Sequence, residues 1–395
     1  MQKLPWRGEI ESGIRMADVS RYETLARIVD WLSACKHRRN PRNSIVTTVL
    51  AGLTLFAMNS PAQSVSTSSV ERFTFRRIEM GVEFRIEVYG CDSRAANKAA
   101  TAAFDRVRQL NAVMSDYTSD SEVRRLCDGD HRQRPVLISS DLYRVLAESV
   151  SLWKDTDGAF DVTVGPLTKL WRRARRRGEM PPLDQLTTAL SAVGSDGILL
   201  DPCSYRVQLT RPGIRIDLGG IAKGYAADEA LKVLRDHGFP QSLVDASGDL
   251  VVGAPPPAAT GWRVVIEQLT EPDSPEISQP HRKRDVVLLA NQAIATSGST
   301  VQFAEIDGRH YSHIVDPGTG LGLQTHSMVT VIAPTGIQAD SLASAVSVLG
   351  AEAGIRFIEN AESDGVQVRV QSVKPSGQTN QQDSAGLCRY IISLP

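Results

Sequence analysis

The segment from Ile214 to Gly253 constrains the fold most, because it predicts a strand, a glycine turn, a helix and a further strand in succession. Apolar alternation at Ile214, Ile216 and Leu218 predicts a short strand that Gly219–Gly220 ends. The helical spacing that follows predicts a helix closed by Gly238. Extended character resumes at Ser242–Val244 and Leu250–Val252.

The glycine turn before this helix predicts a place for an anion. Backbone N–H groups converge at a helix N-terminus, and Lys223 adds a positive charge beside them. The pattern is G-G-x-x-x-G, which is neither a Walker loop nor the dinucleotide fingerprint. A tight turn with an exposed lysine therefore stays open as the alternative.

Length and charge set broad limits. The 395 residues suffice for one large domain or two ordinary ones. Because 44 Lys and Arg balance 45 Asp and Glu, the net charge is -1 and nothing indicates a nucleic-acid partner.

The N-terminal region has the pattern of an export signal. Basic residues within Lys36–Arg42 precede the apolar run Ile45–Ala57, and Ser60–Ala62 supplies small residues for cleavage after Ala62. We therefore expect residues 1–62 to be an N-terminal extension with an export signal, and residues 63–395 to be the functional domain. The expected location is the periplasm or the outer face of the cytoplasmic membrane. The long segment upstream of the signal indicates either a start assigned too early or an atypical leader.

Four cysteines follow the signal, and export bears on their state. An oxidising compartment permits one or two disulfides, and unpaired thiols are an equal alternative. These residues are Cys91, Cys127, Cys203 and Cys388.

Periodicity elsewhere mixes strands and helices without regular alternation, which predicts an α+β fold. Two strands are expected within Glu71–Val88, meeting at Met80–Gly81, and helices over Ala95–Met114 and Ser140–Lys154. The arginine-rich run Trp171–Arg177 is interpreted as solvated surface, with an anionic partner or membrane as the alternative. Two polar stretches, Glu271–Arg284 and Lys374–Ala385, are expected to be surface insertions.

Several short clusters could carry chemistry. Ala295–Gly298 is expected to be a hydroxyl-rich turn after a strand. Asp340 opens a predicted helix, Ser341–Leu349, and shares a face with Ser344. Taken singly, Asp340 could be only an N-cap, His313 a structural histidine and Phe160 a core residue.

Taken in order, the clusters have a common interpretation. The series MG, SDY, DGAFDVTV, IDLGGIAKGYAAD, SGDL, ATSG, SHIVDPGTG and ADSLAS resembles the ApbE family over about Glu79 to Gly350. Members of this family are flavin transferases that use FAD to attach FMN to another protein. The resemblance implies a single α+β domain of mixed sheets and helices, with the cofactor in a cleft between two lobes.

The resemblance also assigns roles by position. It implies FAD contacts at Met80, Tyr117, Gly158, Ala159, Phe160, Asp217, Lys223 and Ile314. It implies a magnesium site at the Gly220 carbonyl, Asp340 and Ser344. The implied catalytic residues are His313, as the base for the acceptor hydroxyl, with Lys223 and Asp217.

The chain departs from the family pattern at three places. Ser344 replaces a threonine, which keeps the hydroxyl. Ser299–Thr300 stands where relatives often have an acidic residue and a tyrosine, and Ser247 replaces a glycine. None of these removes a proposed ligand.

The resemblance therefore implies an exported, Mg²⁺-dependent FAD:protein FMN transferase. FMN would be joined to a threonine or serine of an acceptor redox protein, with release of AMP. The alternatives are a protein that stores FAD without transfer, and a pyrophosphatase that hydrolyses FAD to FMN and AMP. The expected partners are FAD and the acceptor, without nucleic acid, and membrane association through the acceptor or an uncleaved leader stays open.

Overall fold

The computed structural model describes residues 69–129, 134–269, 285–298, 302–361, 365–374 and 377–392. The chain divides into two units, Met1–Thr67 and Ser68–Pro395, and every described residue belongs to the second. The predicted export signal and the stretch Glu271–Arg284 lie outside the described residues.

An eight-stranded antiparallel sheet forms the centre of the second unit, in the order β1-β2-β6-β7-β10-β13-β14-β15. Its strands are β1 (Glu71–Glu79), β2 (Val82–Gly90), β6 (Ser242–Ala246), β7 (Leu250–Val252), β10 (Gln292–Gly298), β13 (Ser327–Ala333), β14 (Gln367–Val373) and β15 (Thr379–Asp383). In the central strands residues on both faces are buried, as in β13, whose seven residues are all buried, so each face packs against its own layer there. The middle of the sheet is therefore covered on both sides, while the edge strands β1 and β15 are mostly exposed.

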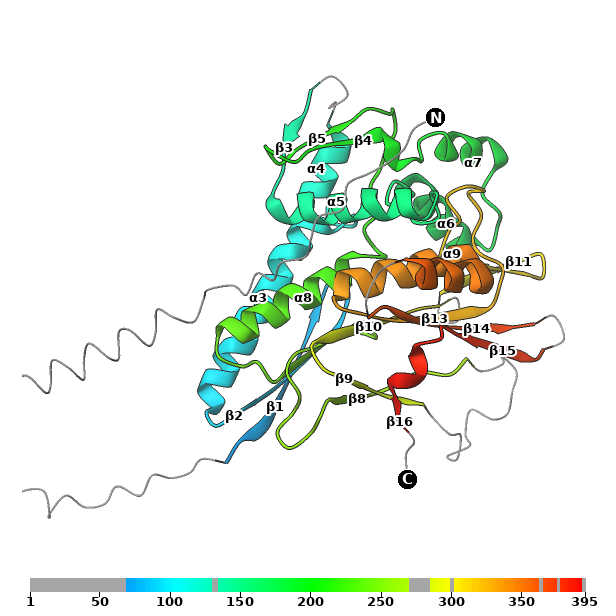
Figure 1. The fold of residues 1–395 in the computed structure, drawn as a ribbon. Helices are drawn as coiled ribbons and strands as arrows, with labels where there is room; N and C mark the ends of the chain where they lie inside the picture. Colours follow the sequence, from blue (N-terminus) through cyan, green and yellow to red (C-terminus); the bar gives the residue numbers. More distant parts are fainter. Residues whose placement is uncertain are drawn as a thin grey trace, which may run out of the picture. The chain divides into compact units, whose positions relative to one another are not determined.

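Three long helices cover one face of this sheet (Figure 1). They are α3 (Ser93–Met114), α8 (Ala222–Asp236) and α9 (Gly336–Asn360). Their packed faces are rich in alanine, which allows close approach: Ala99, Ala103 and Ala230 are fully buried. Gly350, at φ 77°, interrupts α9. By length and composition α9 could cross a membrane, yet here it packs against β10, β13 and α8.

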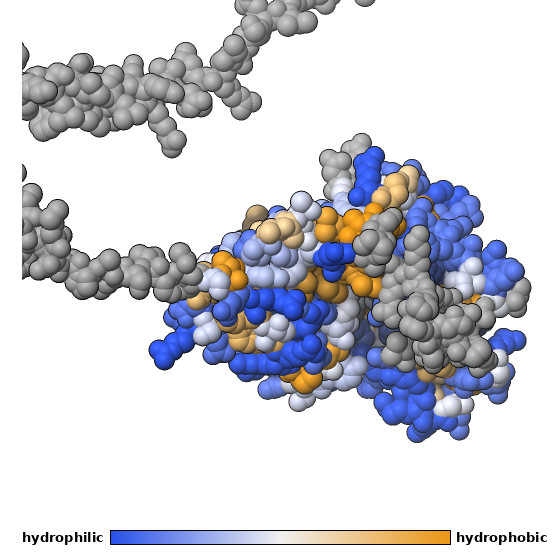
Figure 2. Space-filling view, turned by 90° about the horizontal axis from the view of Figure 1, so that it is seen from below, coloured by the Kyte–Doolittle hydropathy of each residue, from blue (hydrophilic) through white to orange (hydrophobic). Residues whose placement is uncertain are grey.

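A small sheet covers part of the other face. It has the order β16-β9-β8 and consists of β8 (Trp262–Val265), β9 (Val286–Leu289) and β16 (Ile391–Ile392). Trp262 and Val264 pack with Leu243 and Ile294 of the large sheet. Viewed from below, the surface is mainly hydrophilic with a band of apolar residues across it (Figure 2).

The remaining elements build a second, mostly helical lobe beside the helix layer (Figure 1). It comprises α4 (Glu122–Asp128), β3 (Val136–Leu137), α5 (Ser140–Asp155), α6 (Gly165–Arg177), α7 (Leu183–Leu190), η2 (Ser195–Gly197), β4 (Ile198–Asp201) and β5 (Arg206–Leu209). The hairpin β11 (Phe303–Ile306) and β12 (Arg309–Ser312) packs on α6 and α7, and η4 (Leu387–Arg389) precedes β16. The Trp171 indole donates a hydrogen bond of 2.8 Å to the Gly320 carbonyl, which ties α6 to the loop after β12.

Most element predictions are confirmed, including the α+β class. The strand pair meets at Met80–Gly81, both of which have positive φ, and Gly238 (φ 87°) ends α8 with its N–H bonded to the Arg235 carbonyl. The four cysteines after residue 62 are free thiols, so the open alternative of disulfides among them is not realised.

Four expectations about elements are wrong. Ile214–Leu218 is not a strand: Arg215 forms one isolated bridge with Val164, and no strand among the described residues pairs with this segment. Thr296–Gly298 continues β10 instead of turning, since β13 pairs with it. Helix α9 begins at Gly336, four residues before Asp340. The stretch Lys374–Ala385 contains β15, an edge strand.

Candidate functional site

A cavity of about 1710 Å³ lies between the sheet lobe and the helical lobe. It brings together nearly all of the residues singled out from the sequence. Those that line it are Met80, Tyr117, Ala159, Phe160, Asp217, Gly220, Lys223, His313, Ile314, Asp340 and Ser344. Gly158 does not line it.

Gly158 instead shapes the turn that presents its neighbours. Asp157 and Gly158 both have positive φ (50° and 85°), and the Gly158 N–H bonds the Trp153 carbonyl. A left-handed pair of this kind favours glycine. The turn reverses the chain after α5 and directs Phe160, which is only 6% exposed, into the cavity wall.

The floor of the cavity depends on a close approach of α8 and α9. A Cβ on Gly224 would lie 2.0 Å from the Gly336 carbonyl oxygen, so only glycine fits there. The Asp340 carboxylate then accepts the Gly224 N–H at 3.0 Å and also the Lys223 N–H. Burial, with the charge of Asp249, raises the pKa of Asp340 to about 7.

This arrangement corrects the expectation of an external anion at the helix N-terminus. The Ile221 and Ala222 N–H groups bond the Leu218 carbonyl, and those of Lys223 and Gly224 bond Asp340. The protein thus supplies its own negative group there, a carboxylate at the positive end of the α8 dipole. The negative side chain in turn provides a place for a cation.

Gly220 lies against Ser344 in the same part of the cavity wall. A Cβ on Gly220 would lie 2.6 Å from Ser344 Oγ, so the glycine leaves a space that any side chain would fill. Asp340 and Ser344 are one helical turn apart on α9. Within the described ranges no three His, Cys, Asp or Glu residues cluster as metal ligands. The donors here are instead one carboxylate, one hydroxyl and one carbonyl, which are hard oxygen ligands.

Lys223 forms an ion pair with Asp249 at the edge of this space. Burial lowers the pKa of Lys223, but the carboxylates of Asp249 and Asp340 outweigh it and hold the pKa above its usual value. Asp249 is 3% exposed and also accepts the Thr296 N–H. A fixed ammonium group therefore faces the cavity.

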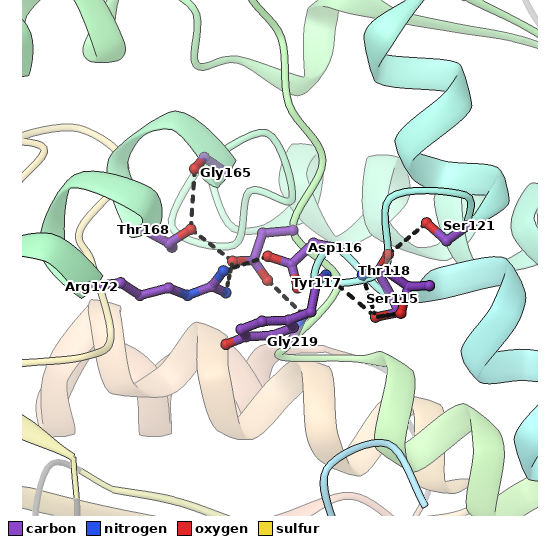
Figure 3. A network of polar contacts seen from close by, with 10 residues as sticks. Ser115, Asp116, Tyr117, Thr118, Ser121, Gly165, Thr168, Arg172 and Gly219 are labelled. Carbon is purple, nitrogen blue, oxygen red and sulfur yellow. Dashed lines mark hydrogen bonds and ion pairs between the residues drawn. The ribbon is translucent and has the colours of Figure 1, made fainter.

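A network of polar contacts around Arg172 also lines the cavity (Figure 3). Its guanidinium donates to Asp116 at 2.5 Å and to Asp217 at 2.9 Å, and lies 4.4 Å from the centroid of the Tyr117 ring. Asp217 also accepts from Thr168 Oγ1 at 2.7 Å and from a turn N–H. Tyr117 is 79% exposed, so one ring face is held by the cation and the other is free.

His313 stands at the mouth of the cavity. Its Nδ1 lies 3.1 Å from the Gln302 carbonyl oxygen. Because a carbonyl can only accept, Nδ1 carries the proton in the neutral ring and Nε2 keeps its lone pair. The ring is accessible from solvent, yet the surrounding protein removes part of its hydration and, with the charge of Arg175, lowers the pKa of His313.

Sequence reasoning missed Arg172, Asp116 and Asp249 as members of the site. Arg172 was assigned to solvated surface with its neighbours; Arg173 and Arg175 are indeed exposed, but Arg172 is half-buried. The sequence did contain a signal that Arg172 belongs to the site. Thr168 and Arg172 are four residues apart and so share the helix face that contacts Asp217.

Comparison with known proteins agrees with this geometry. Residues 80–370 match the ApbE family. The FAD:protein FMN transferase of Haemophilus influenzae is 32% identical over 267 residues, covering 66% of this chain and 75% of that protein. The enzyme of the same name from Escherichia coli K12 is 27% identical over 313 residues, 78% and 87% of the two chains.

Solved structures show the same fold. The flavin transferase ApbE from Vibrio cholerae superposes with a TM-score of 0.71 at 26% identity, covering 82% of this chain and all of that one. The apo flavinyl transferase ApbE of Pseudomonas stutzeri gives 0.69 at 27% identity, covering 82% and 96%.

Proposed function

Because the chain belongs to the ApbE family and is a FAD:protein FMN transferase, we propose that it uses Mg²⁺ to move FMN from FAD to a threonine or serine of an acceptor redox protein. AMP is the leaving group. One observation carries this proposal: a single cavity is lined by the three hard-oxygen donors Gly220, Asp340 and Ser344, which we call the cation cradle, by the Lys223 ammonium and by His313, whose Nε2 keeps its lone pair.

FAD is held by flat and apolar groups at one end of the cavity. The free face of Tyr117, backed by Arg172, and the wall residue Phe160 offer stacking surfaces to its rings. Met80 and Ile314 add apolar contacts, and Asp217 supplies a carboxylate for a ring or ribose donor. These assignments follow the family positions.

The donor chemistry of Gly220, Asp340 and Ser344 fits Mg²⁺. Asp340 would hold it with a carboxylate oxygen, Ser344 with its hydroxyl and Gly220 with its carbonyl. When bound, Mg²⁺ neutralises charge on the pyrophosphate oxygens. Lys223 contributes a second positive charge from the protein itself.

Transfer then needs one proton acceptor and one in-line displacement. The acceptor hydroxyl oxygen attacks the FMN phosphorus while Nε2 of His313 takes its proton, and the bond from that phosphorus to the bridging oxygen breaks. The electron pair leaves with AMP, whose developing charge lies near Lys223.

Export of the mature chain belongs to this proposal as well. The basic and apolar segments before Ala62 support secretion to the periplasm or to the outer face of the cytoplasmic membrane, where a redox acceptor would meet the enzyme. Mass spectrometry of the protein isolated from the periplasmic fraction tests it: a mature N-terminus at Gln63 is expected, and a cytoplasmic full-length chain would contradict it.

The proposed activity is tested by incubating the mature chain with FAD, MgCl₂ and a threonine-containing acceptor fragment. Flavin fluorescence on the acceptor in a denaturing gel, with release of AMP, is expected. Free FMN and AMP without labelling would indicate hydrolysis, and intact FAD would indicate storage. Asp340→Ala is expected to abolish labelling, because it removes the only charged ligand of the cradle.

A further inference from the structure

The cavity is larger than one cofactor needs. Its volume of about 1710 Å³ exceeds the roughly 300–1,000 Å³ of typical single-ligand sites. Besides the residues already described, it is lined by Arg85, Glu87 and Asp245 on the sheet face away from the helices, and by Trp262–Glu267. We call this second part the β8 groove.

Strand β8 has one unused edge. In the small sheet it lies at the end of the order β16-β9-β8, so β9 pairs with one side only. The Ile266 N–H bonds the Asp285 carbonyl, which fixes the alternation of hydrogen-bonding directions along β8. The backbone N–H and C=O groups of residues 262, 264 and 266 point toward β9. The backbone groups of Arg263 and Val265 therefore point the other way, and no strand in the described part of the chain pairs with them.

The unused edge faces the cavity. Side chains of a strand alternate between two faces. A cavity that borders one face of a strand is therefore lined by every second residue. Here six consecutive residues, Trp262 to Glu267, line the cavity. A consecutive lining of this kind indicates that the backbone edge itself borders the space.

We propose that the acceptor protein presents its target hydroxyl from an extended segment that adds as a strand to the free edge of β8. The inference rests on the proposed transferase function and names where its second substrate binds. Edge addition gives affinity through main-chain hydrogen bonds and suits a chain whose target residue must enter a cavity. The segment pairs with Arg263 and Val265, turns alternate apolar side chains toward Tyr89 and Trp262, and leads its hydroxyl to His313.

One proline substitution on the free edge of β8 and one on the free edge of β15 test this proposal. Val265→Pro removes one outward N–H without breaking the bonds to β9, as edge prolines do. The expected result is about a ten-fold rise in KM for a short threonine-containing peptide, with unchanged FAD affinity. The matched control is Gln381→Pro on β15, an edge strand away from the cavity, for which no change in KM is expected.

Unchanged peptide KM in a Val265→Pro enzyme that binds FAD normally would overturn the proposal, while the wild-type transferase activity would still stand. If wild-type protein labels no peptide, the proposed function fails and this inference fails with it.

Hydrogen exchange on wild-type protein decides the question where the variant does not fold. The amides of Arg263 and Val265 are expected to exchange fast with FAD alone and to become protected when the peptide is added. Protection before addition, whether by FAD or by another segment of this chain, would contradict the proposal, as would unchanged fast exchange at saturating peptide.

Discussion

In the proposed mechanism, the protonation state of His313 controls the transfer step. A base must be neutral to take a proton, and the lowered pKa of His313 keeps it neutral to lower pH than an ordinary histidine. We expect kcat/KM for the acceptor to rise with pH along a limb centred below about 6.5, the usual histidine value. Activity should then stay high at neutral pH.

His313→Gln tests this role. It keeps a polar side chain at the cavity mouth but removes the base, so transfer should slow by roughly 10²–10⁴-fold and the acidic limb should vanish. Calorimetric titration with FAD should show nearly unchanged affinity. Equal losses in FAD binding and in transfer would argue against His313 as the base.

Arg172 positions Tyr117 and holds Asp116 and Asp217 together. Without it, nothing from Arg172 would oppose burial and the charge of Asp217, which raise the pKa of Asp116, and the Tyr117 ring would lose its support. Because the guanidinium is partly exposed, we expect Arg172→Ala to weaken FAD binding by about ten-fold, or ~1.4 kcal/mol.

The control for Arg172 is its exposed neighbour. Arg173→Ala removes the same charge from the same helix and should leave FAD affinity unchanged. Arg172→Lys should recover little, because an ammonium group lacks the planar fork that reaches both carboxylates while stacking on a ring. FAD affinities of the three variants, measured by fluorescence quenching, check the prediction; similar values for the two alanine variants would refute it.

Among the elements, α9 depends on a cap that comes from α8. The N-cap residue Thr335 makes no side-chain cap bond; instead the Asp228 carboxylate accepts the N–H groups of Gly336 and Ile337 at 2.7 and 2.9 Å. This contact holds the two helices in the register that places Asp340 against Gly224. Asp228→Ala should therefore lower the free energy of unfolding by about 1–2 kcal/mol.

The same cap has a pH signature. Burial raises the pKa of Asp228 to about 6, above its value of about 3.9 in the unfolded chain. The folded state thus binds more protons between these two values, so this group's contribution to stability falls as pH rises from about 4 to 6. In Asp228→Asn that slope should be absent. Denaturant titrations of both proteins across this range check it, and identical pH profiles would be inconsistent with the shifted pKa.

For the molecule as a whole, sequence patterns predicted the α+β class, the strand pair at Met80–Gly81 and the main helices, because these depend on local periodicity and turn chemistry. Family motifs predicted which residues line the cavity. Patterns could not predict that Ile214–Leu218 lacks a strand partner, that β15 joins the sheet edge, or that Asp340 already occupies the α8 N-terminus. Each of these depends on which distant segment packs alongside, and the sequence at that position does not carry this information.

The most direct measurement is a crystal structure of the mature protein soaked with FAD and Mn²⁺, recorded at a wavelength where manganese scatters anomalously. We predict one anomalous peak within bonding distance of the Asp340 carboxylate, Ser344 Oγ and the Gly220 carbonyl, touching the pyrophosphate of FAD. A peak elsewhere in the cavity, or FAD bound with its pyrophosphate away from these three residues, would contradict the proposed site.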